Sequence, residues 1–184
     1  MIQLVFFLEE RSVEALLKIL LPRIIGSSVD SRYIVFEGKQ DLEKQLIRRM
    51  QGYRTPGARF VVLRDQDAGK CKEIKASLKR KCEQAGRSDA VVRIACHELE
   101  SWYLGDLAAV ERGLSLSGLR RLQNSSPYRT PDKIVNPSAK LARIAKAYQK
   151  IGGSRAIGPY LDVDNVRSCS FGHFVKSIRN LAAQ

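Results

Sequence analysis

The sequence is poor in the residues on which several enzyme classes depend. Its 184 residues include only two histidines, four cysteines and one tryptophan. So few histidines indicate no Ser/His/Asp catalytic set, and the cysteines form no CxxC or Cys/His pattern of a zinc site. The GxxxxGK[ST] signature of P-loop NTPases is also missing. These three kinds of chemistry are therefore excluded.

Long apolar segments are missing as well. No stretch approaches the roughly 18 apolar residues of a membrane span, so we expect no membrane helix. The first apolar run has no basic residues before it and an acidic pair after it, which predicts a strand and not a signal peptide. We therefore predict a cytoplasmic protein whose four cysteines stay reduced as buried free thiols.

Acidic residues are outnumbered by basic ones. The chain has 32 Lys and Arg against 19 Asp and Glu, a formal charge of +13, and 44% of its residues are hydrophobic. That hydrophobic fraction is sufficient for a buried core and argues against disorder. The basic excess is larger in residues 101–184 (13 against 5) than in residues 1–100 (19 against 14). A basic surface suits a phosphodiester substrate, although a charge run is also typical of a solvated face.

The first hundred residues alternate between strand and helix patterns. The mainly apolar run at 2–8 predicts a strand covered on both faces, and further strands are predicted at 33–36, 60–63 and 90–95. Between them, apolar residues recur at helical spacing in 13–24, 42–50 and 71–85. This order predicts an α/β fold with a mainly parallel four-stranded sheet, right-handed crossovers and helices on both faces.

The remaining residues are typical of helices. A loop with three prolines at 124–137 precedes a helix that we expect to start at Ser138 and to end at Gly152 and Gly153. We predict an α/β core at residues 1–105 and a helical extension at 106–184. The two are expected to pack as a single compact unit, because no flexible linker separates them. Trp102 and His173 are expected to pack in the interior.

Acidic residues follow three of the four predicted strands. They are Glu9 and Glu10 after the first strand, Asp65 and Asp67 after the third, and Glu98 and Glu100 after the fourth. Ligands of open parallel sheets bind at the carboxyl ends of the strands, where these side chains are expected to converge. Converging carboxylates repel one another unless a cation lies among them. The pattern therefore predicts a site for Mg²⁺ or Mn²⁺, which prefer oxygen ligands.

Two of these positions have alternative explanations. The spacing of Asp65 and Asp67 directs both carboxylates to one side of an extended chain, within reach of one ion or of two adjacent ions. Acidic residues after strands also cap helices, and Asp67 can instead cap a helix that begins near Ala68. Glu9, taken alone, is as well explained as an exposed turn residue.

The acidic residues resemble those of the Toprim fold. A glutamate directly after the first strand and an Asp-x-Asp after the third, in a βαβαβαβ frame, occur in type IA and type II topoisomerases, bacterial primases and overcoming-lysogenization-defect (OLD) nucleases. The sequence is more similar still to a bacterial Toprim-like family, domain of unknown function family 4276. The matching segments span nearly the whole chain, at 8–17, 62–67, 98–106 and 170–174.

The resemblance implies a Toprim-like, Rossmann-like core and a role for each acidic residue. Glu9 takes the place of the Toprim glutamate, a metal ligand or general acid/base. Asp65 and Asp67 take the place of the metal-binding aspartates. Glu100, with Glu98 as an outer ligand, resembles the additional acidic position of the nuclease-type members. The implied catalytic residues are Glu9, Asp65, Asp67 and Glu100, and the implied Mg²⁺ or Mn²⁺ ligands are these four and Glu98.

Glu10 departs from the Toprim pattern. Toprim sequences commonly have glycine directly after the first glutamate, where it allows close approach of a phosphate or an unusual φ. Its replacement by glutamate implies an altered active-site geometry.

Three functions are compatible with these residues. The first, which the acidic residues favour, is a metal-dependent phosphoryl-transfer enzyme, namely a Toprim-type nuclease acting on DNA or RNA, with a role in phage defence. The second, which Glu10 favours, is a catalytically decayed module that binds nucleic acid or a protein. Its partner would be an ATPase, which the resemblance alone implies. The third is a small-molecule phosphohydrolase, against which the basic excess argues. We expect the first.

Overall fold

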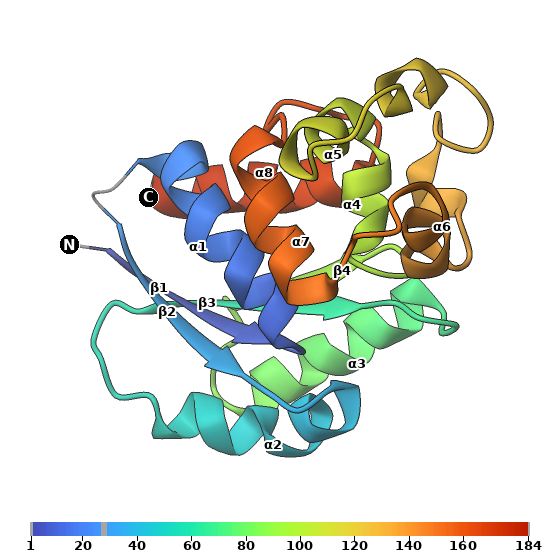
Figure 1. The fold of residues 1–184 in the computed structure, drawn as a ribbon. Helices are drawn as coiled ribbons and strands as arrows, with labels where there is room; N and C mark the ends of the chain where they lie inside the picture. The colour runs from blue at the N-terminus through green and yellow to red at the C-terminus, as the bar shows by residue number, and fades with distance from the viewer. Residues whose placement is uncertain (1, 27–28, 184) are drawn as a thin grey trace.

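The computed structural model describes residues 2–26 and 29–183. Its strands form one parallel sheet in the order β2-β1-β3-β4 (Figure 1). They are β1 (Gln3–Leu8), β2 (Asp30–Val35), β3 (Arg59–Asp65) and β4 (Val91–Ala95). The predicted parallel four-stranded sheet is confirmed, and the fold is Rossmann-like. The third strand is longer than predicted, because it continues through Arg64 and Asp65.

Different helices cover the two faces of the sheet (Figure 1). On one face, α2 (Lys39–Gly52) and α3 (Cys71–Gln84) pack against Val5 and Phe7 of β1. On the other face, α1 (Arg11–Ile25) and α8 (Cys169–Ala182) pack against Leu4 and Phe6. Alternate residues of a strand point to opposite faces, so a strand buried on both sides becomes the continuous apolar run seen in the sequence.

The C-terminal half adds helices to the α1 face of the sheet. These elements are α4 (Glu100–Leu104), α5 (Leu107–Gly113), η1 (Leu119–Leu122), η2 (Pro131–Lys133), α6 (Pro137–Ile144), α7 (Lys150–Ile157) and η3 (Gly158–Tyr160). Their apolar residues share one buried cluster with α1, α8 and β1. Helix α7 lies alongside α1, and α8 lies beside β4 (Figure 1). The division into a core and an extension near residue 105 stays a prediction.

The region between α6 and α7 differs from the prediction. The helix expected from Ser138 is interrupted between Ile144 and Lys150, and the two glycines lie inside α7 instead of ending a helix. The ring of Tyr148 explains one of them. A Cβ atom at Gly153 would lie 2.3 Å from a carbon of that ring, so only glycine leaves room for it. Gly153 therefore leaves room for the Tyr148 ring, and this requirement depends on packing that the local sequence pattern does not show.

Of the four cysteines predicted to be buried, only Cys82 is buried, and His173 is exposed against the prediction. Cys169 and His173 both lie on the outer side of α8, whereas Phe171 and Phe174 fill its inner side. The reason is the 3.6-residue period of the helix, which directs the side chains of Cys169 and His173 away from the stripe formed by Phe171 and Phe174. Trp102, by contrast, is buried as predicted. Among residues 2–26 and 29–183, no helix has the length and apolar character needed to cross a bilayer.

Candidate active site

The strand order creates a switch point at the carboxyl ends of β1 and β3. Strand β1 is flanked by β2 on one side and by β3 on the other, and ligands of open α/β sheets bind where the order reverses in this way. Glu9 directly follows β1, and Asp65 is the last residue of β3. The Asp65 backbone N–H donates to Glu9 Oε2 over 3.1 Å. Two of the residues singled out in the sequence are therefore in direct contact.

Four carboxylates gather at this switch point, and we call Glu9, Glu10, Asp65 and Glu100 the acidic cluster. Asp65 is only 7% exposed and Glu100 only 1%. Burial, together with the negative charges of Glu9, Glu100 and Glu10, raises the pKa of Asp65 well above its usual value. Burial is also the main cause that raises the pKa values of Glu9 and Glu100. Since all three neighbours act on it, Asp65 is the centre of the acidic cluster.

Glu100 has one satisfied and one unsatisfied carboxylate oxygen. Its Oε1 accepts a hydrogen bond from the Tyr148 hydroxyl over 2.8 Å. Its Oε2 is buried and has no hydrogen-bond partner within the described part of the chain. A buried acceptor without a partner costs free energy, and such groups often mark the position of an ion or a water. This oxygen is available to a ligand.

Glu10 directly follows Glu9 and contributes a further carboxylate to the acidic cluster. Its φ of −147° and ψ of 163° are extended values that any residue adopts, so this backbone does not require glycine. Its carboxylate accepts hydrogen bonds from the Ser12 hydroxyl and from Lys150 Nζ, the latter over 3.2 and 3.4 Å. Glu10 therefore enlarges the acidic cluster without distorting the chain.

Basic side chains from two elements, Arg64 on β3 and Lys150 on α7, contact these carboxylates. Arg64, on β3, is 7% exposed, forms an ion pair with Glu43 of α2, and has its Nε 3.8 Å from Glu9 Oε2. Burial alone would lower the pKa of Lys150, but the charges of Glu100 and Glu10 hold it above its usual value. Arg64 and Lys150 thus neutralise part of the negative charge of the converging carboxylates.

Asp67 lies beside the acidic cluster in an unusual backbone conformation. Its φ is +53°, its N–H donates to the His97 carbonyl over 2.7 Å, and His97 Nδ1 lies 3.2 Å from the Asp67 carbonyl oxygen. The Asp67 carboxylate pairs with Lys39 Nζ at 2.7 Å. Helix α3 begins only at Cys71, with Lys70 at its N-cap, so the alternative role of Asp67 as a helix cap is wrong.

Glu98 contacts the start of a helix. Its Oε2 accepts a hydrogen bond from the backbone N–H of Ser138, in the first turn of α6, over 2.7 Å. The first N–H groups of a helix have no partner inside it, and a carboxylate there also suits the helix dipole. The observed contact thus gives Glu98 a role in holding α6, and its role as an outer metal ligand stays a prediction.

We expect Glu98→Ala to lower the free energy of unfolding by about 0.5–2 kcal/mol, the usual cost of losing a side-chain cap. Urea unfolding followed by circular dichroism measures this loss. Glu98→Gln is the matched control, since its amide oxygen still accepts a hydrogen bond and it should lose less. Equal stability of wild type and Glu98→Ala would show that this contact contributes nothing.

The chemistry of the acidic cluster suits a hard divalent cation, since its donors are carboxylate oxygens. Within residues 2–26 and 29–183, no three His, Cys, Asp or Glu side chains are arranged to hold a metal ion as they stand. Glu9, Asp65 and Glu100 nonetheless fit such an ion in donor type. They are also close enough for their charges to act on Asp65, and Glu100 has a buried oxygen without a partner.

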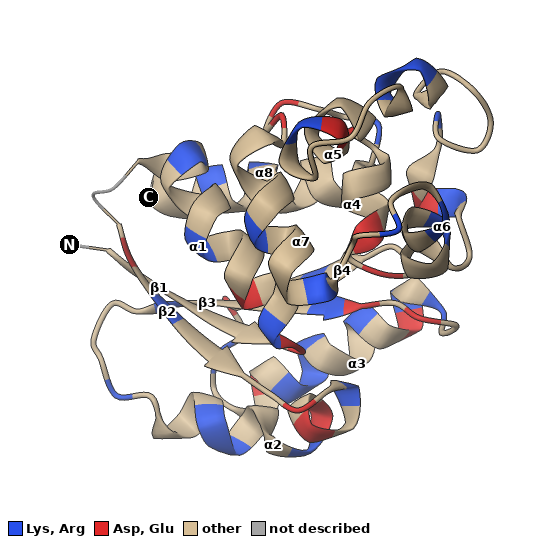
Figure 2. Cartoon of the chain, in the orientation of Figure 1, with Lys and Arg blue, Asp and Glu red and all other residues tan. Residues whose placement is uncertain are grey.

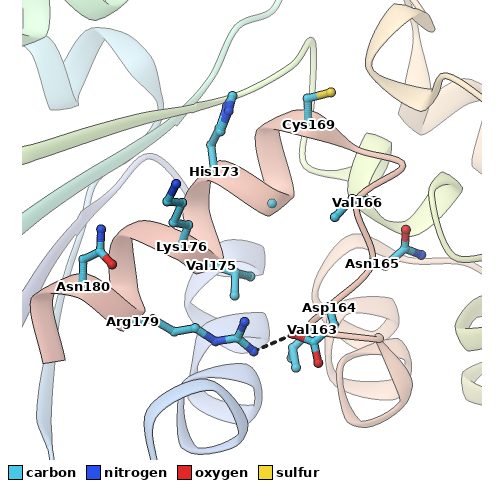
Figure 3. A pocket seen from close by; sticks show the side chains of 11 residues that line it. Val163, Asp164, Asn165, Val166, Cys169, His173, Val175, Lys176, Arg179 and Asn180 are labelled. Atoms are coloured by element: carbon cyan, nitrogen blue, oxygen red, sulfur yellow. Dashed lines mark hydrogen bonds and ion pairs between the residues drawn. The ribbon is translucent and has the colours of Figure 1, made fainter. Parts of the chain in front are cut away.

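A groove lies between α8 and residues 163–166 (Figure 3). It has a volume of about 490 Å³, and Arg179 crosses it to pair with Asp164 at 2.8 Å. None of the residues that line it belongs to the acidic cluster. We therefore assign the candidate site to the carboxyl ends of the strands and not to this groove.

Several residues of the site were not predicted from the sequence. Arg64 had a usable signal, because a charged residue that continues an apolar strand must be buried or paired. Tyr148 and Lys150 had none, because they reach the acidic cluster from 48 and 140 residues away.

The chain is similar to one protein family and to two solved structures. The model of the family described as "Domain of unknown function (DUF4276)" matches residues 8–179. The C-terminal region of the Xanthomonas campestris pv. campestris OLD protein, phased with mercury, is 15% identical with a TM-score of 0.51, over 98% of this chain and 96% of that chain. The same region phased with iodine is 14% identical with a TM-score of 0.43, over 98% of both chains. No curated protein sequence matches significantly.

Proposed function

The chain belongs to the DUF4276 family, and we propose that it is a metal-dependent phosphoryl-transfer enzyme, a Toprim-type nuclease that acts on DNA or RNA. The acidic cluster at the switch point carries this proposal. A buried aspartate surrounded by three carboxylates is unfavourable without a cation. The fold shared with the C-terminal region of the OLD protein is compatible with the proposal.

Each residue of the site has a proposed role. Glu9, Asp65 and Glu100 would hold Mg²⁺ or Mn²⁺, with Asp67 and Glu98 as further candidate ligands beside them. The bound ion supplies stabilisation of the negative charge on the phosphodiester and a lowered pKa for water. In the metal-free protein the Asp65 N–H orients the Glu9 carboxylate, and burial raises the pKa of Glu9; as a ligand of the ion it would be deprotonated.

The basic surface supports a nucleic-acid substrate. Basic segments are visible on α1, α2, α3 and α6 (Figure 2). Candidate phosphate contacts, most of them exposed, are Lys72, Lys75 and Lys79 on α3 and Arg120, Arg121, Arg129 and Lys140 in the C-terminal half. Phosphate contacts of this kind are electrostatic and independent of base sequence.

We therefore expect binding to mixed-sequence oligonucleotides that weakens steeply with salt. If about four phosphates are neutralised, the logarithm of affinity should fall with the logarithm of salt concentration at a slope of about −3 to −4. Fluorescence anisotropy with DNA and RNA, without divalent metal, measures this slope. Changing Lys72, Lys75 and Lys79 together to Gln should make the slope shallower if α3 contacts the substrate. No binding even at low salt would mean that the basic residues form only a solvated surface.

Cleavage is tested separately from binding. Wild-type protein should cleave a mixed-sequence DNA or RNA with Mn²⁺ or Mg²⁺ and should be inactive with a chelator. Binding without cleavage under any of these conditions would contradict the proposed enzyme.

A second candidate function is a catalytically decayed module that binds nucleic acid or a partner ATPase. The observation that favours it is the internal neutralisation of the carboxylates by Arg64, Lys39 and Lys150. Protein cations that permanently replaced a metal would leave binding intact and remove cleavage. Binding without cleavage would make this the better explanation.

A further inference from the structure

Lys150 brings the C-terminal helices into contact with the acidic cluster. Lys150 is the first residue of α7, and its Nζ lies 3.2 and 3.4 Å from the two carboxylate oxygens of Glu10. Two residues earlier, Tyr148 donates its hydroxyl to Glu100. Tyr148, just before α7, and Lys150, at its start, thus place a phenol beside Glu100 after β4 and an ammonium group beside Glu10 after β1.

One ammonium group does not satisfy the acidic cluster. Glu100 Oε2 remains buried without a hydrogen-bond partner in the described residues. Asp65, at the centre, is buried beside three other carboxylates, and no described hydrogen bond or ion pair joins its carboxylate to a basic side chain. Lys150 is held at the Glu10 side of the cluster, where it partly neutralises a charge that a divalent cation would neutralise more fully.

Lys150 is also the more exposed of the two basic side chains that contact the acidic cluster. Its side chain is 48% exposed, and Glu10 is its only hydrogen-bond partner in the described part of the chain. Arg64 differs, since its side chain is 7% exposed and lies between Glu9 and Glu43. A half-exposed ion pair contributes little stability, and the flexible four-carbon side chain of lysine can adopt rotamers in which the pair is broken.

We propose that Lys150 is an internal counter-ion, which a divalent cation displaces when it binds to the acidic cluster. The inference rests on the proposed metal-binding function and deepens it. Lys150 stabilises the metal-free protein by neutralising the carboxylates, and by doing so it lowers the affinity for the metal. Glu10, which pairs with Lys150, retains it at the site.

Calorimetric titration with Mn²⁺ tests this competition. Lys150→Gln removes the positive charge and keeps a side chain of similar length, so we expect Mn²⁺ to bind about tenfold more tightly than in wild type. The titration is done near pH 8, where metal ligands are more fully deprotonated. Lys146→Gln is the matched control, because it changes the net charge equally and Lys146 makes no ion pair within the described residues. Its affinity should stay within about twofold of wild type.

The outcomes separate this inference from the proposed function. Mn²⁺ binding to wild type with equal or weaker binding to Lys150→Gln would overturn the role of Lys150 and leave the metal site intact. Saturable Mn²⁺ binding to neither protein would overturn both. Tighter binding to Lys146→Gln by the same factor would reduce the effect to net charge and overturn the specific role of Lys150.

Amine labelling of the unmodified wild-type protein gives a second measurement that does not depend on a variant folding. If the metal displaces Lys150, acetylation of its amine, measured by mass spectrometry, should become faster when Mg²⁺ is added. Lys146 should react at the same rate with and without Mg²⁺. An unchanged or slower reaction of Lys150 at saturating Mg²⁺ would contradict displacement.

Discussion

Asp65→Asn is expected to reduce metal-dependent cleavage by at least about 100-fold while making the metal-free protein more stable. The substitution keeps the size of the side chain but removes the central charge of the acidic cluster, which is proposed to hold the metal. Without metal, burial and the charges of Glu9, Glu100 and Glu10 disfavour the Asp65 carboxylate, so its replacement by a neutral amide should raise the free energy of unfolding.

The dependence of stability on pH follows from the same raised pKa. The folded protein holds the proton of Asp65 more tightly than the unfolded chain, whose carboxyl has its ordinary pKa near 3.8. The stability from this protonation is complete below the ordinary pKa and is lost as the pH rises through the raised folded value. Metal-free wild type should therefore lose stability as the pH rises from about 4 towards neutral, and Asp65→Asn should lose less.

Urea unfolding at a series of pH values, with a chelator present, measures both effects. The matched control is Asp89→Asn, since Asp89 is exposed and precedes β4 at the edge of the sheet opposite the acidic cluster. It should behave like wild type in cleavage and in stability. An Asp65→Asn protein that is less stable than wild type at neutral pH would contradict the burial of an uncompensated charge.

Trp102→Ala is expected to lower the free energy of unfolding by about 3–5 kcal/mol, the range for truncating a large buried aromatic residue. Trp102 is 2% exposed, and its ring lies 5.1 Å from that of Phe171 and 5.2 Å from that of Phe174. Its Nε1 donates to Ser170 Oγ over 3.0 Å, so the substitution also leaves a buried hydroxyl with one partner fewer. The loss should be large because Trp102 joins α4 to α8.

The measurement is urea unfolding by circular dichroism, since the substitution removes the only tryptophan. Tyr160→Ala is the control, as Tyr160 is 41% exposed and should cost less than about 1 kcal/mol. A similar loss for both variants would show that Trp102 is not a principal core residue.

The sheet could be predicted from the sequence because its signals are local. Most of the strands are mainly apolar and the intervening helices have the 3.6-residue period, so element order and parallel topology follow, although β2 (DSRYIV) starts three residues before its apolar segment. The C-terminal half depends on distant contacts. Gly153 is suited to a helix end by its residue type, but it lies inside α7, where the ring of Tyr148 occupies the space that a side chain would take.

The candidate site could also be predicted in part from the sequence. The rule that parallel strands deliver their following residues to one edge placed Glu9, Asp65 and Glu100 together, and the structure brings these three near one another. The rule does not fix side-chain direction. Glu98, in the same short segment as Glu100, contacts α6, and only the fold reveals the lysine that reaches Glu10 from 140 residues away.

The central claim is that the acidic cluster binds a divalent cation, and calorimetric titration with Mn²⁺ tests it most directly. Wild type and Asp89→Asn should give the same saturable heat, and Asp65→Asn should give none, because its central ligand is gone. Equal heats for wild type and Asp65→Asn, or no saturable heat for wild type, would contradict a metal site at the carboxyl ends of β1 and β3.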